Sequence, residues 1–484
     1  MNFTISEQRS YMRKIGLLII FILYNTSFSQ DTQYWSQQYG TNSFYLGGAV
    51  IGSILDLSAT YYNPGAIALM KNPEFITGSK SVSLTRFRFK DGGGNGHDFK
   101  SLRGDTPPDL FAGLFSFSQD PKDRLVYSIL VRKRMKFRVY ASANDLRDIA
   151  TAGPGNDQYS GMSQIGWDVN ETWMGLTYSK LLGKNVGFGL TQYFCYFGLY
   201  TGFDIDSQAL TDDHSIPLTH LTQFINSYNI RTLSKFGLFF NYSPVKYGLT
   251  ITLPSINLFG FGDYYVNETF IDQNGSSLNN DTNYMDAYFI KDVKANYPSS
   301  WTIGAGSSFK FNNSQVHFSI EWFAKVKPFN HLELPEIINK TTGEKEQLSL
   351  MQEYKSVTNV GLGWEHIFNN HFSLFGGATT NFTSTPPGSF TSISLSDWDI
   401  YQITIGTVFS YKWLNMNTGL MYAFGKEKAQ QIINYPTASL ENNLLGNITM
   451  ANIDYKSLKL VLGFSLKLFT ESKKKRKQKN RNRM

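Results

Sequence analysis

The amino-acid sequence predicts an all-β fold, a transmembrane antiparallel β-barrel of about 14 strands. Composition is the first observation behind this prediction. Aromatic residues make up 15% of the 484 residues and charged residues only 17%, yet the mean hydropathy is −0.27. A helical membrane protein needs apolar spans of about 20 residues, which would raise the mean well above zero. Strands that expose every second residue to lipid instead combine many aromatic residues with a polar mean.

Alternation of apolar and polar residues is the second observation. In the last segment, apolar residues at every second position alternate with small or charged ones: Leu458, Leu460, Leu462, Phe464, Leu466 and Leu468 against Ser457, Lys459, Val461, Gly463, Ser465 and Lys467. The segments 301–310, 315–322, 359–365 and 401–411 repeat the pattern. A period of two indicates strands whose two faces lie in different solvents. Trp413 and Phe469, near strand ends, suit the aromatic girdles of a barrel.

Turn spacing is the third observation. Six tight turns, at 120–123, 183–184, 244–245, 312–313, 369–370 and near Leu414, join twelve strands. An opening strand at about 76–90 and a closing strand at 456–469 bring the count to fourteen. The other connections are predicted as long polar loops at 91–108, 141–169, 207–229, 256–298, 327–353, 384–398 and 426–455. Short turns on one side and long loops on the other are typical of outer-membrane barrels with both termini in the periplasm.

Two of these loops carry further patterns. Residues 218–225 have apolar residues at helical spacing, which fits a short amphipathic helix and ordinary loop packing equally well. Residues 264–271 and 287–293 fit an extra hairpin within the loop 256–298.

The two ends of the chain are predicted to lie outside the barrel. Arg13 and Lys14 precede a short apolar run, and Ser27 and Ser29 fit a cleavage site, so residues 1–29 are predicted as a secretory signal peptide. Residues 470–484 form a predicted basic periplasmic tail. Eight basic residues between 473 and 483 account for the charge of +7, which falls to −1 without them. The body of the protein therefore has no basic excess that would indicate nucleic-acid binding.

Catalytic and metal-binding motifs are absent from the sequence. It contains no Gly-x-Ser-x-Gly, His-Glu-x-x-His or P-loop motif. The single cysteine, Cys195, excludes an internal disulfide and a cysteine-based metal cluster. The sequence therefore predicts a protein that is not an enzyme and needs no cofactor or metal.

One segment, residues 47–69, differs from the rest because it is rich in small residues and precedes the first strand. It resembles the N-terminal plug of the FadL/TodX-type family of outer-membrane transporters for long-chain fatty acids and aromatic hydrocarbons. The matching residues are Asp56, Ser58, Ala59, Tyr62, Asn63 and Pro64, while Gly65 replaces the usual alanine. Locally, Pro64 fixes φ, Asn63 can bond its own backbone, and Gly65 permits a positive φ. Residues 253–255, 297–304 and 361–365 also resemble segments of this family.

The resemblance implies a 14-stranded barrel with a plug in its lumen, divided into a plug segment at 30–75 and a barrel at 76–469. It implies passive, plug-gated uptake of hydrophobic molecules such as fatty acids or hydrocarbons by a monomer in the outer membrane, surrounded by outer-membrane lipid. The matching plug residues would gate the channel, and no motif assigns the ligand-binding residues. The family releases ligand through a kink in its third strand, but the predicted third strand, Arg124–Tyr140, contains no Gly or Pro and carries the run Arg132-Lys133-Arg134.

A second function fits the same pattern. A barrel of this shape can serve as an assembly or docking component of a protein secretion system, with the loops 141–169, 256–298 and 426–455 and the basic tail as docking surfaces. A general porin is less favoured, because of the plug segment and because the inward faces carry Gly, Ser and Thr rather than opposed charges.

Overall fold

The computed structural model describes residues 33–54, 56–70, 76–77, 80–106, 110–115, 123–149, 157–212, 214–271, 283–341, 343–386, 398–411 and 414–466. The predicted signal peptide at 1–29, the tail at 470–484, and Trp413, Leu468 and Phe469 lie outside these residues. The domain boundaries based on them remain predictions. None of the described helices is long and apolar enough to cross a membrane.

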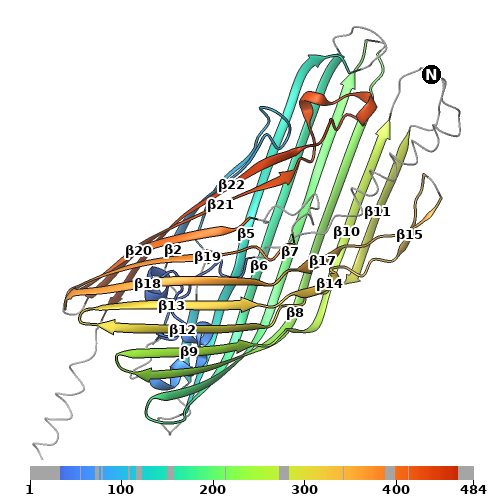
Figure 1. Ribbon diagram of the computed structural model, residues 1–484. Helices are drawn as coiled ribbons and strands as arrows, with labels where there is room; N and C mark the ends of the chain where they lie inside the picture. Colours follow the sequence, from blue (N-terminus) through green and yellow to red (C-terminus); the bar gives the residue numbers. More distant parts are fainter. Residues whose placement is uncertain are drawn as a thin grey trace, which may run out of the picture.

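The described chain forms an antiparallel barrel of fourteen wall strands (Figure 1). Four wall strands consist of two segments each, and pairing of the last strand with the first closes the ring. In ring order the wall strands are β1/β2 (Ile76–Thr77, Lys80–Lys90), β3/β4 (Phe99–Asp105, Leu110–Phe115), β5 (Asp123–Arg147), β6 (Asp157–Leu181), β7 (Val186–Leu210), β8 (Leu218–Tyr242), β9/β10 (Val245–Thr252, Ile256–Ile271), β11/β12 (Tyr284–Lys294, Thr302–Phe311), β13 (Ser314–Phe323), β18 (Val357–Asn369), β19 (Phe372–Asn381), β20 (Ile400–Tyr411), β21 (Leu414–Gln430) and β22 (Met450–Leu466). The predicted count and the antiparallel pairing on either side of all six turns are confirmed, whereas residues 120–122 of the first turn and 412–413 of the last lie outside the described residues.

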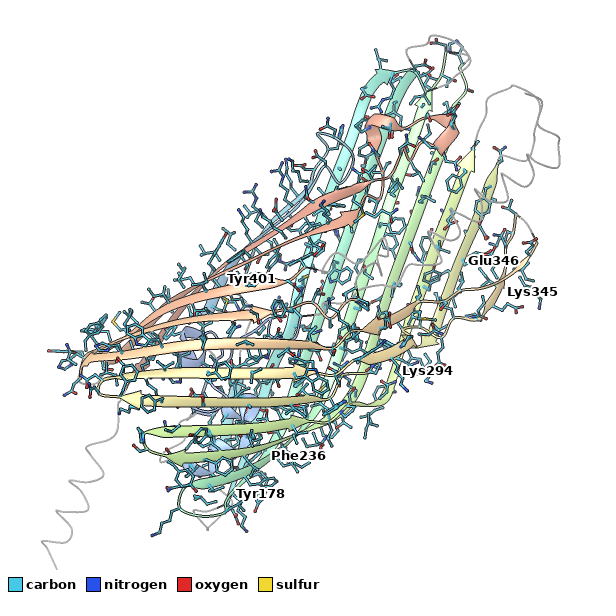
Figure 2. All side chains as sticks on the ribbon, viewed as in Figure 1. Tyr178, Phe236, Lys294, Lys345, Glu346 and Tyr401 are labelled. Atoms are coloured by element: carbon cyan, nitrogen blue, oxygen red, sulfur yellow. The ribbon has the colours of Figure 1, made fainter. Side chains whose placement is uncertain are left out.

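The alternating residues face where the pattern predicted. Leu458, Leu460 and Leu462 are 42%, 39% and 45% exposed on the outside, whereas Lys459 and Val461 between them are buried in the lumen. Tyr178 and Tyr401 are likewise on the outside of the wall (Figure 2). Because side chains alternate across a strand, one face can meet lipid while the other lines the interior. The outward apolar band is therefore the surface that would contact lipid.

The wall is taller on one side than the predicted loops allowed (Figure 1). Strands β5 to β8 have 25 residues each, although about 9–11 residues suffice to cross a bilayer. The predicted loops 141–169 and 207–229 are therefore wrong, since β5 runs to Arg147 and β8 begins at Leu218. The loops 91–108 and 426–455 are also shorter than predicted, because β3 and the ends of β21 and β22 occupy part of them. Beyond the lipid, both faces of a strand are polar or covered by loops, so the alternation that marks a strand is lost.

Two further predictions concern this tall side. Residues 218–225 form no helix; they belong to β8, where they pair with β7 and β10. The hairpin in 256–298 exists, but it adds no wall strand. Its two arms, β10 and β11, continue β9 and β12 upward, and β10 pairs with the upper half of β8. The long ladder with two neighbours outweighs the weak helical spacing of residues 218–225.

The barrel interior is filled by the plug below and by two loops above. The plug (residues 33–70 of the described chain) contains α2 (Thr41–Tyr45), α3 (Ala59–Tyr62) and the 3-10 helix η1 (Pro64–Leu69), and it packs into a lower apolar cluster with the wall. The mouth loops contain β14 (Val326–Asn330), β15 (Glu336–Ile338), β16 (Lys345–Gln347), β17 (Met351–Tyr354), η2 (Tyr435–Thr437) and η3 (Leu440–Asn442). They pack into an upper apolar cluster with the tall wall.

The loop 431–449 closes the mouth by direct hydrogen bonds to the tall wall. The Tyr435 hydroxyl donates to the Ala141 carbonyl at 3.0 Å, and the Ser207 hydroxyl donates to the Leu444 carbonyl at 3.0 Å. The other mouth loop carries charged side chains such as Lys345 and Glu346 at the outer rim (Figure 2). A solute entering from this end would first meet the upper apolar cluster.

Candidate functional site: the plug and the buried lumen

The first half of the plug motif is held together locally. The Asp56 carboxylate accepts hydrogen bonds from the backbone N–H of Ser58 at 2.8 Å and from its hydroxyl at 2.5 Å. These bonds precede Ala59, the first residue of α3. Burial raises the pKa of the Asp56 carboxyl above its ordinary value, because desolvation outweighs these two bonds. The Tyr62 hydroxyl accepts from the Tyr39 backbone N–H at 3.0 Å and so ties the end of α3 to the start of the plug.

Asn63 and Pro64 turn the plug against the wall. The Asn63 side-chain oxygen accepts from the Gly65 N–H at 3.1 Å, which confirms the predicted bond to its own backbone. Its amide also donates to the carbonyls of Ile51 and Leu238, both at 3.0 Å. One side chain thus joins two parts of the plug to β8. Pro64 starts η1, where its missing N–H would have no helical partner.

Gly65 has a different role from the predicted one. Its φ is not positive. Instead, a Cβ at this position would lie 2.7 Å from the carbonyl oxygens of both Gly187 and Gly237 in the wall. The prediction of a positive φ is therefore wrong, and glycine replaces the usual alanine because the plug backbone touches the wall here.

The wall meets the plug through a belt of glycines. At each of these positions a Cβ would lie less than 3 Å from a plug atom: Gly187, Gly189, Gly237, Gly248, Gly306, Gly377, Gly406 and Gly419. Hydroxyls beside the belt donate to plug carbonyls, as from Ser179 to Pro64 at 2.9 Å and from Thr404 to Tyr45 at 2.8 Å. The Gly, Ser and Thr composition of the inward faces thus reflects contact with the plug backbone.

Above the plug lies a buried group of charged side chains, which we call the cationic pocket. It comprises four basic and two acidic residues, all at most 7% exposed: Arg132, Lys133, Arg231, Lys235, Glu171 and Glu321. Aromatic residues close it, with Tyr61 of the plug and Trp173 on one side and Tyr297 and Tyr354 on the other. The pocket therefore lies between the lower and upper apolar clusters.

Glu171 is the centre of the pocket. It accepts a hydrogen bond from Arg231, lies 3.8 Å from Arg132, and accepts from the Trp173 indole at 2.7 Å. The Arg231 guanidinium also lies over the Tyr297 ring, 4.2 Å from its centroid. Even so, the Nε atoms of Arg132 and Arg231 have no hydrogen-bond partner among the described residues.

Glu321 joins the pocket to the plug. It accepts from the Trp35 indole at 2.7 Å and lies 3.7 Å from the Lys235 ammonium. Lys133 reaches the Tyr297 hydroxyl at 3.4 Å. With four cations and two anions, the pocket has a surplus of two positive charges. Buried charge without compensation is strongly unfavourable, so the surplus favours an anionic ligand group.

A second cavity of about 110 Å³ lies beside a discontinuity in the wall. Strand β5 pairs with β4 only through residues 125–130, and among the described residues no ladder joins its upper part to β3. The register of β5 against β6 shifts between Val131 and Lys133, which makes Arg132 a bulge. The third strand, β5, thus departs from regular pairing, although Arg124–Tyr140 contains no Gly or Pro.

Among the described residues, the contacts across this part of the wall are made by side chains. Arg134 lies 3.3 Å from Asp105, and Arg103 donates to the Lys136 carbonyl at 3.2 Å. Behind them the cavity is lined by two stacked aromatic pairs, Phe87 with Phe137 at 4.9 Å and Trp398 with Tyr455 at 5.4 Å between ring centroids. We call this place the wall gap. An apolar solute leaving the lumen there would cross no backbone hydrogen bond between described strands.

Sequence reasoning found the plug motif but not the cationic pocket. It singled out the run Arg132-Lys133-Arg134, of which only the first two residues face the pocket while Arg134 bridges the wall gap. Glu171, Arg231 and Lys235 were missed. The sequence did contain a signal for this pocket. Several neighbouring strands carry a charged residue at an inward position, although the other inward residues are small or apolar.

Comparison with known proteins supports the fold. No protein-family model matches the sequence, and no curated protein matches it. Solved structures do match. The chain is similar to a Pseudomonas aeruginosa FadL homologue (11% identity, TM-score 0.51, covering 92% of this chain and 100% of that one) and to the Pseudomonas putida toluene transporter TodX (13%, 0.51, 90% and 100%). The chain is also similar to a TodX mutant described as a monoaromatic hydrocarbon channel, with 12% identity and a TM-score of 0.54, covering 90% of this chain and 100% of that one.

The chain has the fold of the FadL/TodX transporters. At 11–13% identity the likeness shows the architecture alone. The resemblance of the plug motif in the sequence and the likeness of the whole chain in space both point to the FadL/TodX fold. The described lumen of this barrel contains the glycine belt, the cationic pocket and the wall gap.

Proposed function

We propose that this protein is an outer-membrane channel for passive, plug-gated uptake of hydrophobic molecules with an anionic head group, such as long-chain fatty acids. The cationic pocket carries this proposal. A surplus of buried positive charge between two apolar clusters fits a ligand with a carboxylate at one end and an apolar chain at the other. The toluene transporters of similar fold are named for an uncharged solute, so the head group is the feature that this pocket adds.

The proposed route follows the interior. The solute is captured among the aromatic residues of the mouth loops, and its head group displaces contacts in the cationic pocket. The plug, including Asp56, Ser58, Ala59, Tyr62, Asn63, Pro64 and Gly65, then shifts, and the solute leaves through the wall gap. The driving force is the concentration gradient, since no residues for an energy source are evident in the sequence.

The proposed setting is the outer membrane of a Gram-negative cell. The short turns and both ends of the barrel wall lie at one end, which we place in the periplasm, and the tall wall with its loops faces the exterior. One chain closes the barrel by itself, so we propose that it acts as a monomer surrounded by outer-membrane lipid.

Binding of oleate and of oleyl alcohol, which differ at the head group, tests the proposal with purified full-length protein. We expect oleate to bind at least tenfold more tightly. The substitution Lys133→Gln should reduce this preference at least tenfold, because a hydrogen bond to a charged group contributes about 1.5–3 kcal/mol. The matched control is Lys184→Gln, an exposed lysine in the turn between β6 and β7.

Three outcomes would contradict the proposal in different ways. Equal affinity for oleate and oleyl alcohol would show that the protein does not recognise an anionic head group. Unchanged oleate uptake after deletion of the gene would remove fatty acids as the physiological substrate. A stoichiometric protein that co-purifies from membranes, without lipid in the lumen, would favour the docking role in a secretion system instead.

A further inference from the structure

The outer wall around the barrel seam, formed by β21, β22, β2 and β3, changes along the strands from an apolar row, through a mixed row, to basic rows. Tyr422, Leu458 and Leu84 lie side by side across three strands and are 40%, 42% and 48% exposed. The next outward row toward the tall end places Lys456 directly opposite Arg86, with the exposed Phe424 and Leu102 on either side of this pair. Outward side chains on a strand recur every second residue, so this boundary is a feature of the outer surface.

Two more rows continue the basic surface. Arg88 lies opposite Lys100 on one side and Asp454 on the other, and Asp454 lies opposite Lys426. The last row pairs Asn452 with Lys90 and with Lys428. The basic patch therefore comprises seven cations with Asp454 as the acidic residue among them: Arg86, Arg88, Lys90, Lys100, Lys426, Lys428 and Lys456.

Most of this charge is not neutralised within the protein. Asp98 lies 2.5 Å from Arg88 and 3.2 Å from Lys100, and Asp454 lies 4.0 Å from Lys426. The other four cations, Arg86, Lys90, Lys428 and Lys456, form no ion pair with any described residue. Like charges directly opposite each other destabilise a strand pair, so Arg86 and Lys456 favour an anion bound between them.

The far side of the barrel provides a contrast. At the tall end of β7 and β8 the outward positions carry Asp204, Asp206 and His220, where His220 bonds to Asp206. The outward charge at the tall ends of β7 and β8 is therefore mainly acidic, in contrast to the basic patch at the seam.

We propose that the basic patch binds the phosphate groups of a phosphorylated glycolipid of the outer leaflet, the lipid A part of lipopolysaccharide. Such a lipid carries phosphates directly above its acyl chains, and the wall presents cations directly above an apolar surface. Phosphate is bound well by arginine and lysine through charge-assisted hydrogen bonds. A nucleic acid would use the cations but leave the adjoining apolar row without a partner.

This site goes beyond the proposed uptake function and shares with it only the orientation of the tall end toward the exterior. Basic clusters near a membrane surface gain affinity for anionic lipid with each added Lys or Arg. The patch would hold a lipid beside the wall gap, since β3 borders both.

Titration of purified full-length protein in neutral detergent with bisphosphorylated lipid A, read by native mass spectrometry, tests the site. The patch variant is Arg86→Gln/Lys90→Gln/Lys428→Gln/Lys456→Gln. The matched control, Lys184→Gln/Lys291→Gln/Lys310→Gln/Lys327→Gln, removes four exposed lysines elsewhere. We expect at least tenfold weaker binding by the patch variant and a change below twofold in the control. Binding should also weaken as salt is raised.

The probes separate the sources of phosphate. Dephosphorylated lipid A should bind at least tenfold more weakly, and inorganic phosphate should neither bind measurably nor compete. Equal binding of the two lipids, effective competition by inorganic phosphate, or equal affinities of patch and control variants would each overturn the proposal. If the fourfold variant does not fold, Lys90→Gln/Lys428→Gln at the outer row makes the same comparison. Oleate binding should be unchanged in both variants, so failure of this proposal and failure of uptake are distinguishable.

Discussion

Replacing Gly65→Ala should loosen the plug by a predictable amount. The added Cβ would lie 2.7 Å from two backbone oxygens, at Gly187 and Gly237, whereas carbon–oxygen contacts settle at about 3.3–3.6 Å. Both oxygens belong to the ladder between β7 and β8, which cannot yield without losing hydrogen bonds, so the plug must move. Overpacking of this kind costs about 1–3 kcal/mol. The gain of about 0.4–1 kcal/mol that alanine brings by restricting the unfolded chain is smaller.

A destabilisation of the docked plug by about 1–3 kcal/mol corresponds to about a 5–150-fold larger population of undocked plug. Thr60 is fully buried in the plug, and the single natural cysteine can be removed as Cys195→Ser. In that background, maleimide labelling of Thr60→Cys reports how often the plug opens. We expect Gly65→Ala to raise the labelling rate by this factor. Gly104→Ala, whose Cβ would meet no atom within 4 Å, should leave it unchanged. Equal rates in the two variants would refute the close-approach role of Gly65.

The other contacts of the interior give further predictions. The double variant Leu46→Cys/Gly363→Cys should form a disulfide after a small adjustment, because the two Cβ atoms would lie 3.1 Å apart. Oxidation should then block oleate uptake, and reduction should restore it. Uptake through the oxidised form would show that the plug does not need to move. Trp35→Phe removes the bond to Glu321 and should speed plug labelling by about 10–100-fold, since a bond to a charged group contributes about 1.5–3 kcal/mol; no change would make that bond dispensable. His331 lies in a mouth loop, where burial lowers its pKa to about 4. The contribution of neutral His331 to the stability of the folded loop is fully present above the unfolded pKa of about 6.5. It is lost as the pH falls toward 4, and about 2 kcal/mol has been lost at pH 5. Hydrogen exchange in residues 326–354, corrected for intrinsic rates, should show this loss, and His331→Gln should abolish it.

The parts of the fold that sequence reasoning predicted are those where the chain meets two different solvents. Hairpin turns such as 312–313 and alternation such as that of Leu458 and Lys459 follow from lipid on one face and lumen on the other. The upper ends of β5 and β7 and the upper halves of β6 and β8 lie beyond this difference, so their alternation is weak and they were predicted as parts of the loops 141–169 and 207–229. In residues 218–225 the spacing of apolar residues happens to resemble that of a helix. These residues nevertheless form a strand, because they pair with the neighbouring long strand β7.

The site was predictable where it depends on local chemistry. The bonds of Asn63 and the turn at Pro64 involve residues within a few positions, so the motif carries them. The cationic pocket joins β5, β6, β8 and β13, and only closure of the barrel brings Arg132, Arg231 and Glu321 together. The role of Gly65 was missed for the same reason, since its constraint comes from glycines more than 100 residues away.

The bulge at Arg132 connects the three parts of the proposed channel. Just before it, the Val131 carbonyl accepts from the Tyr39 hydroxyl of the plug at 3.0 Å; at it, Arg132 enters the cationic pocket and donates to the Tyr34 carbonyl at 3.2 Å. The pairing of β5 with β4 ends at Leu130, two residues before the bulge, and the wall gap follows along the upper part of β5.

An anion that binds Arg132 would compete with the contact to the plug at Tyr34, so in the proposed channel head-group binding and plug release would be coupled through this residue. Lys133 already faces inward beside Arg132, so deletion of Arg132 leaves the alternation of β5 intact and removes only the extra residue. We expect the deletion variant to fold as a barrel, to extend the pairing of β5 across the wall gap, and to lose oleate uptake. Lys133→Gln removes a positive charge from the same pocket but keeps the bulge, and it should weaken oleate binding while leaving the gap open. Normal uptake by the deletion variant would show that solute does not leave through the gap.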